Sequence, residues 1–121
     1  MKIERIKEKG VDIAIVRADG VLISDVQSAL DLVATVAFTE GGNRIVMPKS
    51  VLAEDFFNLR TRLAGEMLQK FINYQVKVAI VGDFSTYTSK SLKDFIYESN
   101  QGKDIFFVAD EKQAIEKLVA C

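Results

Sequence analysis

Apolar and polar residues alternate along the first part of the chain. The segments KIERIK and VDIAIVRA place apolar side chains at about every second position, and the short polar segment EKG lies between them. A period of two is typical of β-strands with one buried face. The pattern therefore predicts a hairpin of two strands at the start of the chain.

After the turn expected at Asp19-Gly20, the apolar spacing lengthens to that of a helix. The apolar residues with this spacing are Val26, Ala29, Leu30, Val33 and Ala37, and Gly41-Gly42-Asn43 follows them. This predicts a helix that ends at the glycine pair. Ser24 and Gln27 have the S-x-x-Q spacing of a capping box, in which each side chain satisfies a free backbone N–H of the other residue. We therefore expect these two residues to begin the helix.

Three further apolar runs alternate with helical segments. RIVM, which is closed by the only proline, Pro48, and the runs VKVAIV and DIFFV predict strands; AEDFFNLRTRLAGEMLQKFINY, SKSLKDFIYESN and DEKQAIEKLVA predict helices. Strands that alternate with helices imply a mostly parallel sheet with right-handed crossovers. The sequence therefore predicts an α/β fold of order ββαβαβαβα with one mixed sheet, in a single domain that spans residues 1–121.

One charged residue interrupts the apolar face of the longest predicted helix. At about 100° per residue, a single stripe is formed by Phe56, Leu63, Ala64, Met67, Leu68 and Phe71, and Arg60 falls inside it. Burying an unpaired guanidinium costs several kcal/mol. Three alternatives follow: the helix is broken near Asn58–Thr61, the charged end of Arg60 reaches solvent, or Arg60 meets a carboxylate or a bound anion.

The segment VGDFSTYTSKSLKDF joins the VKVAIV strand to the next helix. Gly82-Asp83 should end the strand, and six of the seven residues from Ser85 to Ser91 carry hydroxyl groups. A helix N-terminus after a parallel strand offers free N–H groups to phosphate, so this segment is a candidate ligand or phosphorylation site. It lacks both G-x-x-x-x-G-K-[ST] and G-x-G-x-x-G. We therefore favour helix-start chemistry, in which Thr88 or Ser89 caps the helix and Phe84 packs against the sheet or a neighbouring helix.

Composition narrows the classes of function. The 121 residues include 16 Lys and Arg and 17 Asp and Glu, for a formal net charge of -1, so no basic excess indicates nucleic-acid binding. The chain has no histidine, and its one cysteine, Cys121, is the last residue. A disulfide within one chain, a His/Cys zinc site and serine-histidine catalysis are therefore excluded. We expect no metal and no cofactor.

Neither a signal peptide nor a membrane span is expected. The segment MKIERIKEKG lacks an apolar h-region. No apolar stretch approaches the ~20 residues that a membrane-spanning helix needs. The sequence thus predicts a cytoplasmic protein.

The run EDFFNLRTRLAGEMLQKFINYQVKVAIVGDFSTYTSKSLKDFIYESNQG closely resembles a family of small bacterial proteins known as domain of unknown function 4180. The most specific parts are DFF, AGEMLQKF, NY, VGDFS and FIYESN. The resemblance covers nearly the whole chain. It carries over no activity, because none is assigned to that family.

More distantly, the order of elements resembles the STAS domain, the fold of the anti-sigma-factor antagonist SpoIIAA. That resemblance implies an N-terminal hairpin, recognition of a protein partner, and a phosphorylated serine that follows an aspartate at the start of the second helix. Asp55 matches the aspartate, whereas Phe56 stands where the serine should be. Thr61 is the nearest hydroxyl downstream. The resemblance also implies a recognition surface around Asp55–Arg62 and the adjacent loop Asp83–Ser89.

These observations leave three possible functions. The least favoured is an enzyme, for which Tyr87 and Asp83 would be the first acid-base candidates. The leading hypothesis is a non-enzymatic interaction or regulatory module that binds a protein partner or its own copy, as in a homodimer. The alternative is a protein that binds a small molecule or anion, such as a phosphate, nucleotide or lipid, where the loops after the second and third parallel strands share a crevice. The candidate binding residues are Asp55, Arg60, Thr61, Arg62, Asp83, Ser85, Thr86, Tyr87 and Ser89.

Overall fold

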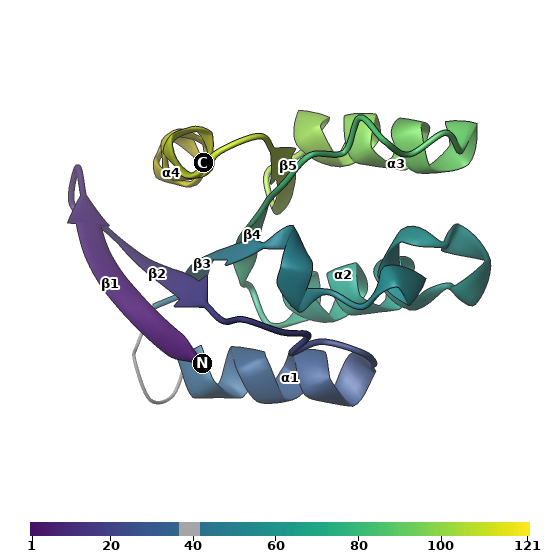
Figure 1. Ribbon diagram of the computed structural model, residues 1–121. Helices are drawn as coiled ribbons and strands as arrows, with labels where there is room; N and C mark the ends of the chain where they lie inside the picture. Colours follow the sequence, from purple (N-terminus) through teal and green to yellow (C-terminus); the bar gives the residue numbers. More distant parts are fainter. Residues whose placement is uncertain (37–41) are drawn as a thin grey trace.

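The computed structural model describes residues 1–36 and 42–121. It contains one mixed sheet of five strands and four α-helices in the predicted order (Figure 1). The elements are β1 (Lys2–Glu8), β2 (Val11–Arg17), α1 (Val26–Ala34), β3 (Arg44–Pro48), α2 (Leu63–Asn73), β4 (Lys77–Val81), α3 (Lys90–Gln101), β5 (Ile105–Val108) and α4 (Glu111–Ala120). Ala37 and Gly41, which were expected in the first helix and at its end, lie outside the described residues.

The strands lie in the sheet in chain order, β1-β2-β3-β4-β5. β1 pairs antiparallel with β2, and every later neighbour is parallel. Because β2, β3, β4 and β5 follow one another in one direction across the sheet, right-handed crossovers place α1, α2 and α3 on the same face. α4 covers the opposite side (Figure 1). The loops after β3 and β4 therefore leave the sheet at the same edge and toward the same face.

Apolar side chains fill both faces of the central strands. Ile45, Met47, Val78 and Ile80 face α1, α2 and α3, whereas Val46 and Ala79 face α4. This explains the nearly continuous apolar runs of β3 and β4, which are typical of parallel strands covered on both faces. Seven phenylalanines belong to the core or pack on it: Phe56, Phe57, Phe71, Phe84, Phe95, Phe106 and Phe107.

The capping box of α1 lies one residue later than predicted. Asp25 is the N-cap, and its carboxylate accepts a hydrogen bond from the backbone N–H of Ser28 at 2.8 Å. The Ser28 hydroxyl oxygen in turn accepts from the Asp25 N–H at 3.1 Å. The hydrogen bond that the Ser28 backbone N–H donates to the carboxylate lowers the pKa of Asp25, and the Ser28 side chain lowers it further. The prediction of Ser24 and Gln27 was wrong, because D-x-x-S satisfies the same two N–H groups in the next register.

The predicted long helix before VKVAIV begins only at Leu63, as α2. Its first part forms two 3₁₀ turns instead, over Glu54–Phe57 and Leu59–Thr61. The Asn58 side chain accepts from the N–H of Arg60 at 3.1 Å, and Arg62 has a left-handed backbone with φ 63°. A non-glycine residue in that conformation ends a turn and redirects the chain. Of the three alternatives for Arg60, the break near Asn58–Thr61 is confirmed.

The outer edge of the sheet at β5 is closed by a side chain of α3. Asn100 Nδ2 donates to the carbonyl oxygen of Phe107 at 3.1 Å, and Asn100 Oδ1 accepts from the Phe107 N–H at 2.7 Å. These are the two groups that a further strand would pair with. At the other edge, β1 carries exposed charges at Lys2, Glu4, Arg5, Lys7 and Glu8. Both devices oppose edge-to-edge association of sheets.

Candidate functional site

The loops after β3 and β4 lie side by side at the carboxyl edge of the sheet. Lys49 directly follows Pro48, the last residue of β3, and its Nζ donates to the carbonyl oxygen of Asp83 at 3.3 Å. Gly82 directly follows β4 and sits against Lys49: a Cβ atom added to Gly82 would lie 2.6 Å from Lys49 Cβ. Glycine therefore permits the close approach of the two loops, which the sequence predicted to share a crevice.

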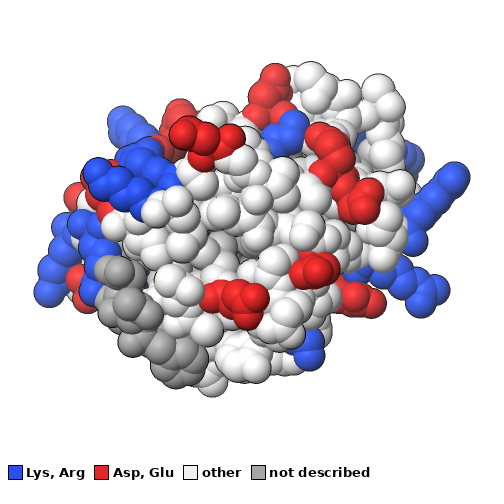
Figure 2. All heavy atoms as spheres, turned by 60° about the horizontal axis from the view of Figure 1, so that its bottom comes forward, with Lys and Arg blue, Asp and Glu red and all other residues white. Residues whose placement is uncertain are grey.

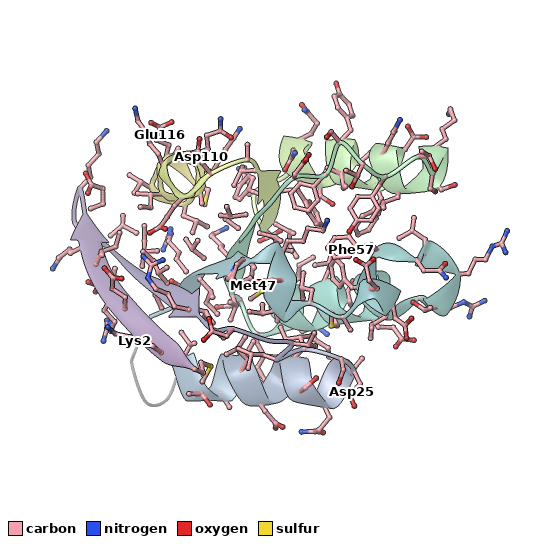
Figure 3. The ribbon with its side chains drawn as sticks, in the orientation of Figure 1. Lys2, Asp25, Met47, Phe57, Asp110 and Glu116 are labelled. Carbon is pink, nitrogen blue, oxygen red and sulfur yellow. The ribbon has the colours of Figure 1, made fainter. Side chains whose placement is uncertain are left out.

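A cluster of aromatic rings joins the same two loops. The rings of Phe57 and Tyr87 stack with centroids 5.0 Å apart and an interplanar angle of 19°. Phe84 lies 6.1 Å from Phe57 and packs edge-on against Phe107 of β5 at 5.4 Å. Figure 3 places Phe57 in the space between α3 and the segment that leads into α2. Each aromatic pair contributes about 0.5–1.5 kcal/mol beyond its buried area, so the cluster links Phe84 and Tyr87 to Phe57 across the two loops.

The ammonium group of Lys49 lies over this aromatic cluster. Its Nζ is 4.4 Å from the ring centroid of Tyr87, 5.5 Å from that of Phe57 and 6.0 Å from that of Phe84. Cation–π attraction at these distances adds to the contact with the Asp83 carbonyl. Lys49 and Phe57 were missing from the candidate residues. The position of Lys49, directly after the strand-ending proline, was the one signal in the sequence that could have identified it.

Asp83 forms a turn with Ser85. Its Oδ1 accepts hydrogen bonds from the Ser85 hydroxyl at 2.5 Å and from the Ser85 N–H at 2.9 Å. The hydroxyl contact is the main cause of a lowered pKa at Asp83, followed by the backbone contact, and the charge of Lys49 adds to them. A carboxylate with a lowered pKa is a weaker base than an ordinary aspartate. The geometry therefore gives Asp83 a structural role in the loop.

The start of α3 follows the predicted helix-start chemistry. Ser89 is the N-cap, and its Oγ accepts from the N–H of Leu92 at 3.2 Å. The prediction that Thr88 or Ser89 caps this helix is confirmed for Ser89. Phe84 packs on the core beside the sheet, as expected. Ser85 and Thr86 are exposed, and Tyr87 is half-buried.

The segment before α2 has a fixed backbone and exposed charges. The Thr61 hydroxyl lies 2.7 Å from the carbonyl oxygen of Asp55 and 2.8 Å from that of Asn58, and it accepts from the Leu63 N–H at 3.3 Å. Phe56 and Phe57 anchor the same segment in the core. The side chains of Asp55, Arg60 and Arg62 remain at the surface. We call Asp55–Arg62 together with Asp83–Ser89 the two-loop surface.

A hollow of about 580 Å³ opens along the two-loop surface and the first turn of α3. Its lining residues are Phe57, Asn58, Leu59, Arg60, Ser89 and Ser91. The structure thus brings Arg60 and Ser89 together, although 29 positions separate them in the sequence. Within residues 1–36 and 42–121, neither Arg60 nor Arg62 forms an ion pair. The hollow is therefore a surface depression with an aromatic wall, hydroxyl groups and an available guanidinium.

A larger hollow of about 810 Å³ lies between the tip of the β1-β2 hairpin and α4. Ile115 and Val119 form its apolar floor, and charges of both signs surround it, among them Glu8 and Lys112. Glu111 at its rim is already paired with Arg17 at 3.0 Å. We prefer the smaller hollow as the candidate site, because it combines polar groups from two loops at the carboxyl ends of parallel strands.

Charge is distributed without a dominant sign on the face that Figure 2 shows. Acidic side chains are scattered across the middle of this face and most basic side chains lie at its left and right margins, so no basic patch crosses it as a path for nucleic acid. No helix in the described part of the chain has the length and apolar character to cross a membrane. Among the same residues, no group of three or more His, Cys, Asp or Glu side chains could hold a metal ion.

Comparison with known proteins gives one match. A family model described as Domain of unknown function (DUF4180) matches residues 8–118. No curated protein and no solved structure matches the chain. The matched range includes both loops of the candidate site.

Proposed function

The chain belongs to the family described as Domain of unknown function (DUF4180), whose description names no activity. We propose that it is a cytoplasmic, non-enzymatic, STAS-like module that binds a protein partner. The partner docks on the two-loop surface and presents acidic groups to Arg60 and Arg62. This proposal extends the resemblance to partner-binding STAS domains, and fold by itself does not carry function.

The observation that carries the proposal is the state of Arg60. Its side chain is exposed beside the hollow and forms no ion pair within the described residues. By contrast, Arg17 pairs with Glu4 and Glu111, and Arg44 donates to backbone carbonyl groups of Leu118 and Cys121. Arginine and aromatic residues are enriched among the side chains that dominate binding at protein interfaces. Here Phe57 supplies the aromatic neighbour of Arg60 in the same hollow.

Fixed backbone geometry supports a role in recognition. The hydrogen bonds of Asn58 and Thr61, together with the buried rings of Phe56 and Phe57, hold the segment that carries Arg60. A surface that is ordered before binding loses less conformational entropy when a partner docks. The Asp55–Arg62 part of the two-loop surface therefore meets one of the main requirements of a specific interface.

The same contacts make it unfavourable to phosphorylate the Asp55–Arg62 segment, so phosphorylation there is not expected to control partner binding. Phe56 occupies the position of the STAS serine and has no exposed surface. The Thr61 hydroxyl, the nearest alternative acceptor, is held by backbone carbonyl groups of Asp55 and Asn58. A phosphate on Thr61 would break these hydrogen bonds and the turn that they stabilise. We therefore propose that the charge of Arg60 and not a phosphorylated residue governs partner binding.

Affinity capture with charge-reversed variants tests the proposal. The tagged wild type, Arg60→Glu and the control Arg5→Glu are used to capture proteins from cells that produce the chain natively. Arg5 is exposed on β1, far from the two-loop surface, so the control makes the same change of charge elsewhere. We expect at least one protein to bind the wild type and Arg5→Glu, with a loss of about tenfold or more in affinity for Arg60→Glu. Binding that is equal for all three forms would contradict the proposal.

The hollow itself favours a second candidate, a small anionic ligand. Its volume of about 580 Å³ falls within the usual range for ligand sites, and Arg60 faces the capped start of α3 across it. A ligand at 100 times its dissociation constant adds about 2.7 kcal/mol of stability. Thermal-shift measurements with phosphate, nucleotides and fatty acids should then show stabilisation of the wild type and none of Arg60→Gln. The absence of any shift in the wild type would leave the protein partner as the surviving proposal.

A further inference from the structure

The Tyr87 hydroxyl group is buried without a hydrogen-bond partner. It is the one buried side-chain nitrogen or oxygen atom of this kind among residues 1–36 and 42–121. Folded proteins leave few such groups, because a buried hydroxyl without a partner gives up its hydrogen bonds to water. The inward position of Tyr87 is therefore favoured by its ring and opposed by its hydroxyl group.

The Tyr87 ring packs at the margin of the core and makes two specific contacts there. It stacks on Phe57 at 5.0 Å, and the Lys49 ammonium lies 4.4 Å from its centroid. Both contacts are favourable, but each is modest for a half-buried residue. The unpaired hydroxyl group offsets part of what the ring gains, which lowers the free energy needed to reach a state with the ring out.

The backbone around Tyr87 is fixed at its ends and weakly held between them. Asp83 and Ser85 form the turn at one end, and Ser89 caps α3 at the other. Residues 84–88, which we call the Tyr87 loop, contain no helix or strand. Their one backbone hydrogen bond with each other, from the Tyr87 N–H to the Phe84 carbonyl oxygen, is long at 3.5 Å. The loop can therefore change conformation while the two ends stay in place.

We infer that the Tyr87 loop is a gate over the candidate site. In the closed state, Tyr87 covers Phe57 and lies under Lys49, as the structure shows. In the open state, the ring leaves Phe57 and the hydroxyl group enters water. Opening uncovers an aromatic face of Phe57, which already lines the hollow beside Arg60, and enlarges that hollow. The gate is a property of the fold, so its test needs no partner and stands apart from the test of the proposed function.

Acetylation of tyrosine by N-acetylimidazole measures opening directly, because the reagent modifies the phenol oxygen only where it is accessible. The chain has three tyrosines. Tyr74 and Tyr97 are exposed, at 57% and 67%, and serve as internal references in the same sample. Peptide mass spectrometry then gives the rate at each position. We expect Tyr87 to react roughly 10- to 1,000-fold more slowly than Tyr97, as for a minor open state.

Dependence on urea separates the gate from unfolding. Opening of a single loop exposes little surface, so the rate of Tyr87 acetylation should change little in low urea. If Tyr87 instead became accessible only through global unfolding, its acetylation rate would rise steeply with urea. A Tyr87 rate that follows global unfolding would overturn the gate. A Tyr87 rate equal to that of Tyr97 would overturn it as well, since the closed state would then not be populated.

A pair of lysine variants tests the contact that keeps the gate closed. Lys49→Met keeps the length of the side chain and removes the charge over the ring, so the Tyr87 rate should rise about threefold or more. Lys93→Met, on the exposed side of α3, is the matched control and should leave the rate unchanged. Equal Tyr87 rates in the wild type and in folded Lys49→Met would contradict the proposed closing contact. Should Lys49→Met fail to fold, the urea dependence of the wild type still decides.

Discussion

Asn100 should contribute strongly to stability, because its side chain satisfies both backbone groups of Phe107 at the edge of β5. Phe107 is only 5% exposed, so Asn100→Ala leaves a buried N–H and a buried carbonyl oxygen without these partners. Each buried group left without a hydrogen bond costs about 1–3 kcal/mol. Water can reach the strand edge and replace part of the lost hydrogen bonding, so the expected cost for both groups together is roughly 2–4 kcal/mol. Alanine regains about 0.6 kcal/mol of helix propensity within α3. The net destabilisation expected for Asn100→Ala is therefore about 1.5–3.5 kcal/mol.

Equilibrium urea unfolding with matched variants measures this contribution. Asn73→Ala, in the exposed last turn of α2, has the same gain in helix propensity and removes only a hydrogen bond to Gln69, so its effect should stay within about 0.5 kcal/mol. Asn100→Asp keeps an acceptor for the Phe107 N–H and loses the donor, so it should fall between the wild type and Asn100→Ala. Equal stabilities of Asn100→Ala and Asn73→Ala at an unchanged m-value would show that Asn100 does not stabilise the edge of β5.

Three further predictions concern the loop after β4, and urea unfolding checks each of them. Gly82→Ala should destabilise the fold by about 1–3 kcal/mol, because the new Cβ would lie 2.6 Å from Lys49 Cβ. This destabilisation should be smaller when Lys49 is also replaced by glycine, and an equal destabilisation in that background would show that no clash occurs. Ser89→Ala should cost about 1 kcal/mol as a lost helix cap, and Thr88→Ala less than about 0.5 kcal/mol; the reverse order would refute the assignment of the cap. The pKa of Asp83 is lowered in the folded protein, so its contribution to stability is fully present above the pKa of this residue in the unfolded chain and is lost as the pH falls through the folded pKa. Asp83→Asn should therefore lose less stability than the wild type as the pH falls below about 5. The same dependence of stability on pH in both proteins would count against this linkage.

Most elements could be predicted from the sequence because their signals are local. The alternation in β1 and β2 and the apolar runs of β3, β4 and β5 identified every strand of the described sheet. The first residues of α1 and α2 were predicted wrongly, because two local signals compete at each of these helix starts. Ser24 and Asp25 are both good caps, and only the extended backbone of Asp25 shows which register is used. The apolar stripe from Phe56 to Phe71 predicted one helix, but the side chains of Asn58 and Thr61 bond the backbone and replace its first part by 3₁₀ turns.

The contacts of the candidate site were harder to predict, because they join residues that are distant in sequence. The sequence did identify Arg60 and the hydroxyl segment as candidates, and Arg60, Ser89 and Ser91 line one hollow. The interaction of Lys49 with the Tyr87 ring depends on how β3 and β4 align in the sheet, which no pattern within either segment reports. The role of Asn100 was missed for a similar reason: in the sequence it looks like a helix end, and only the packing of α3 beside β5 brings it to Phe107.

Photo-crosslinking in cells that produce the protein natively tests whether the two-loop surface binds a protein partner through Arg60. A photoreactive amino acid at the exposed position of Thr86 lies on this surface, and the same group at the exposed position of Lys112 lies on α4, across the sheet. We expect a discrete crosslinked protein from position 86 that disappears when Arg60→Glu is added, and none of the same mass from position 112. Crosslinking from position 86 that survives Arg60→Glu, or no crosslinked protein from position 86, would contradict this mode of binding.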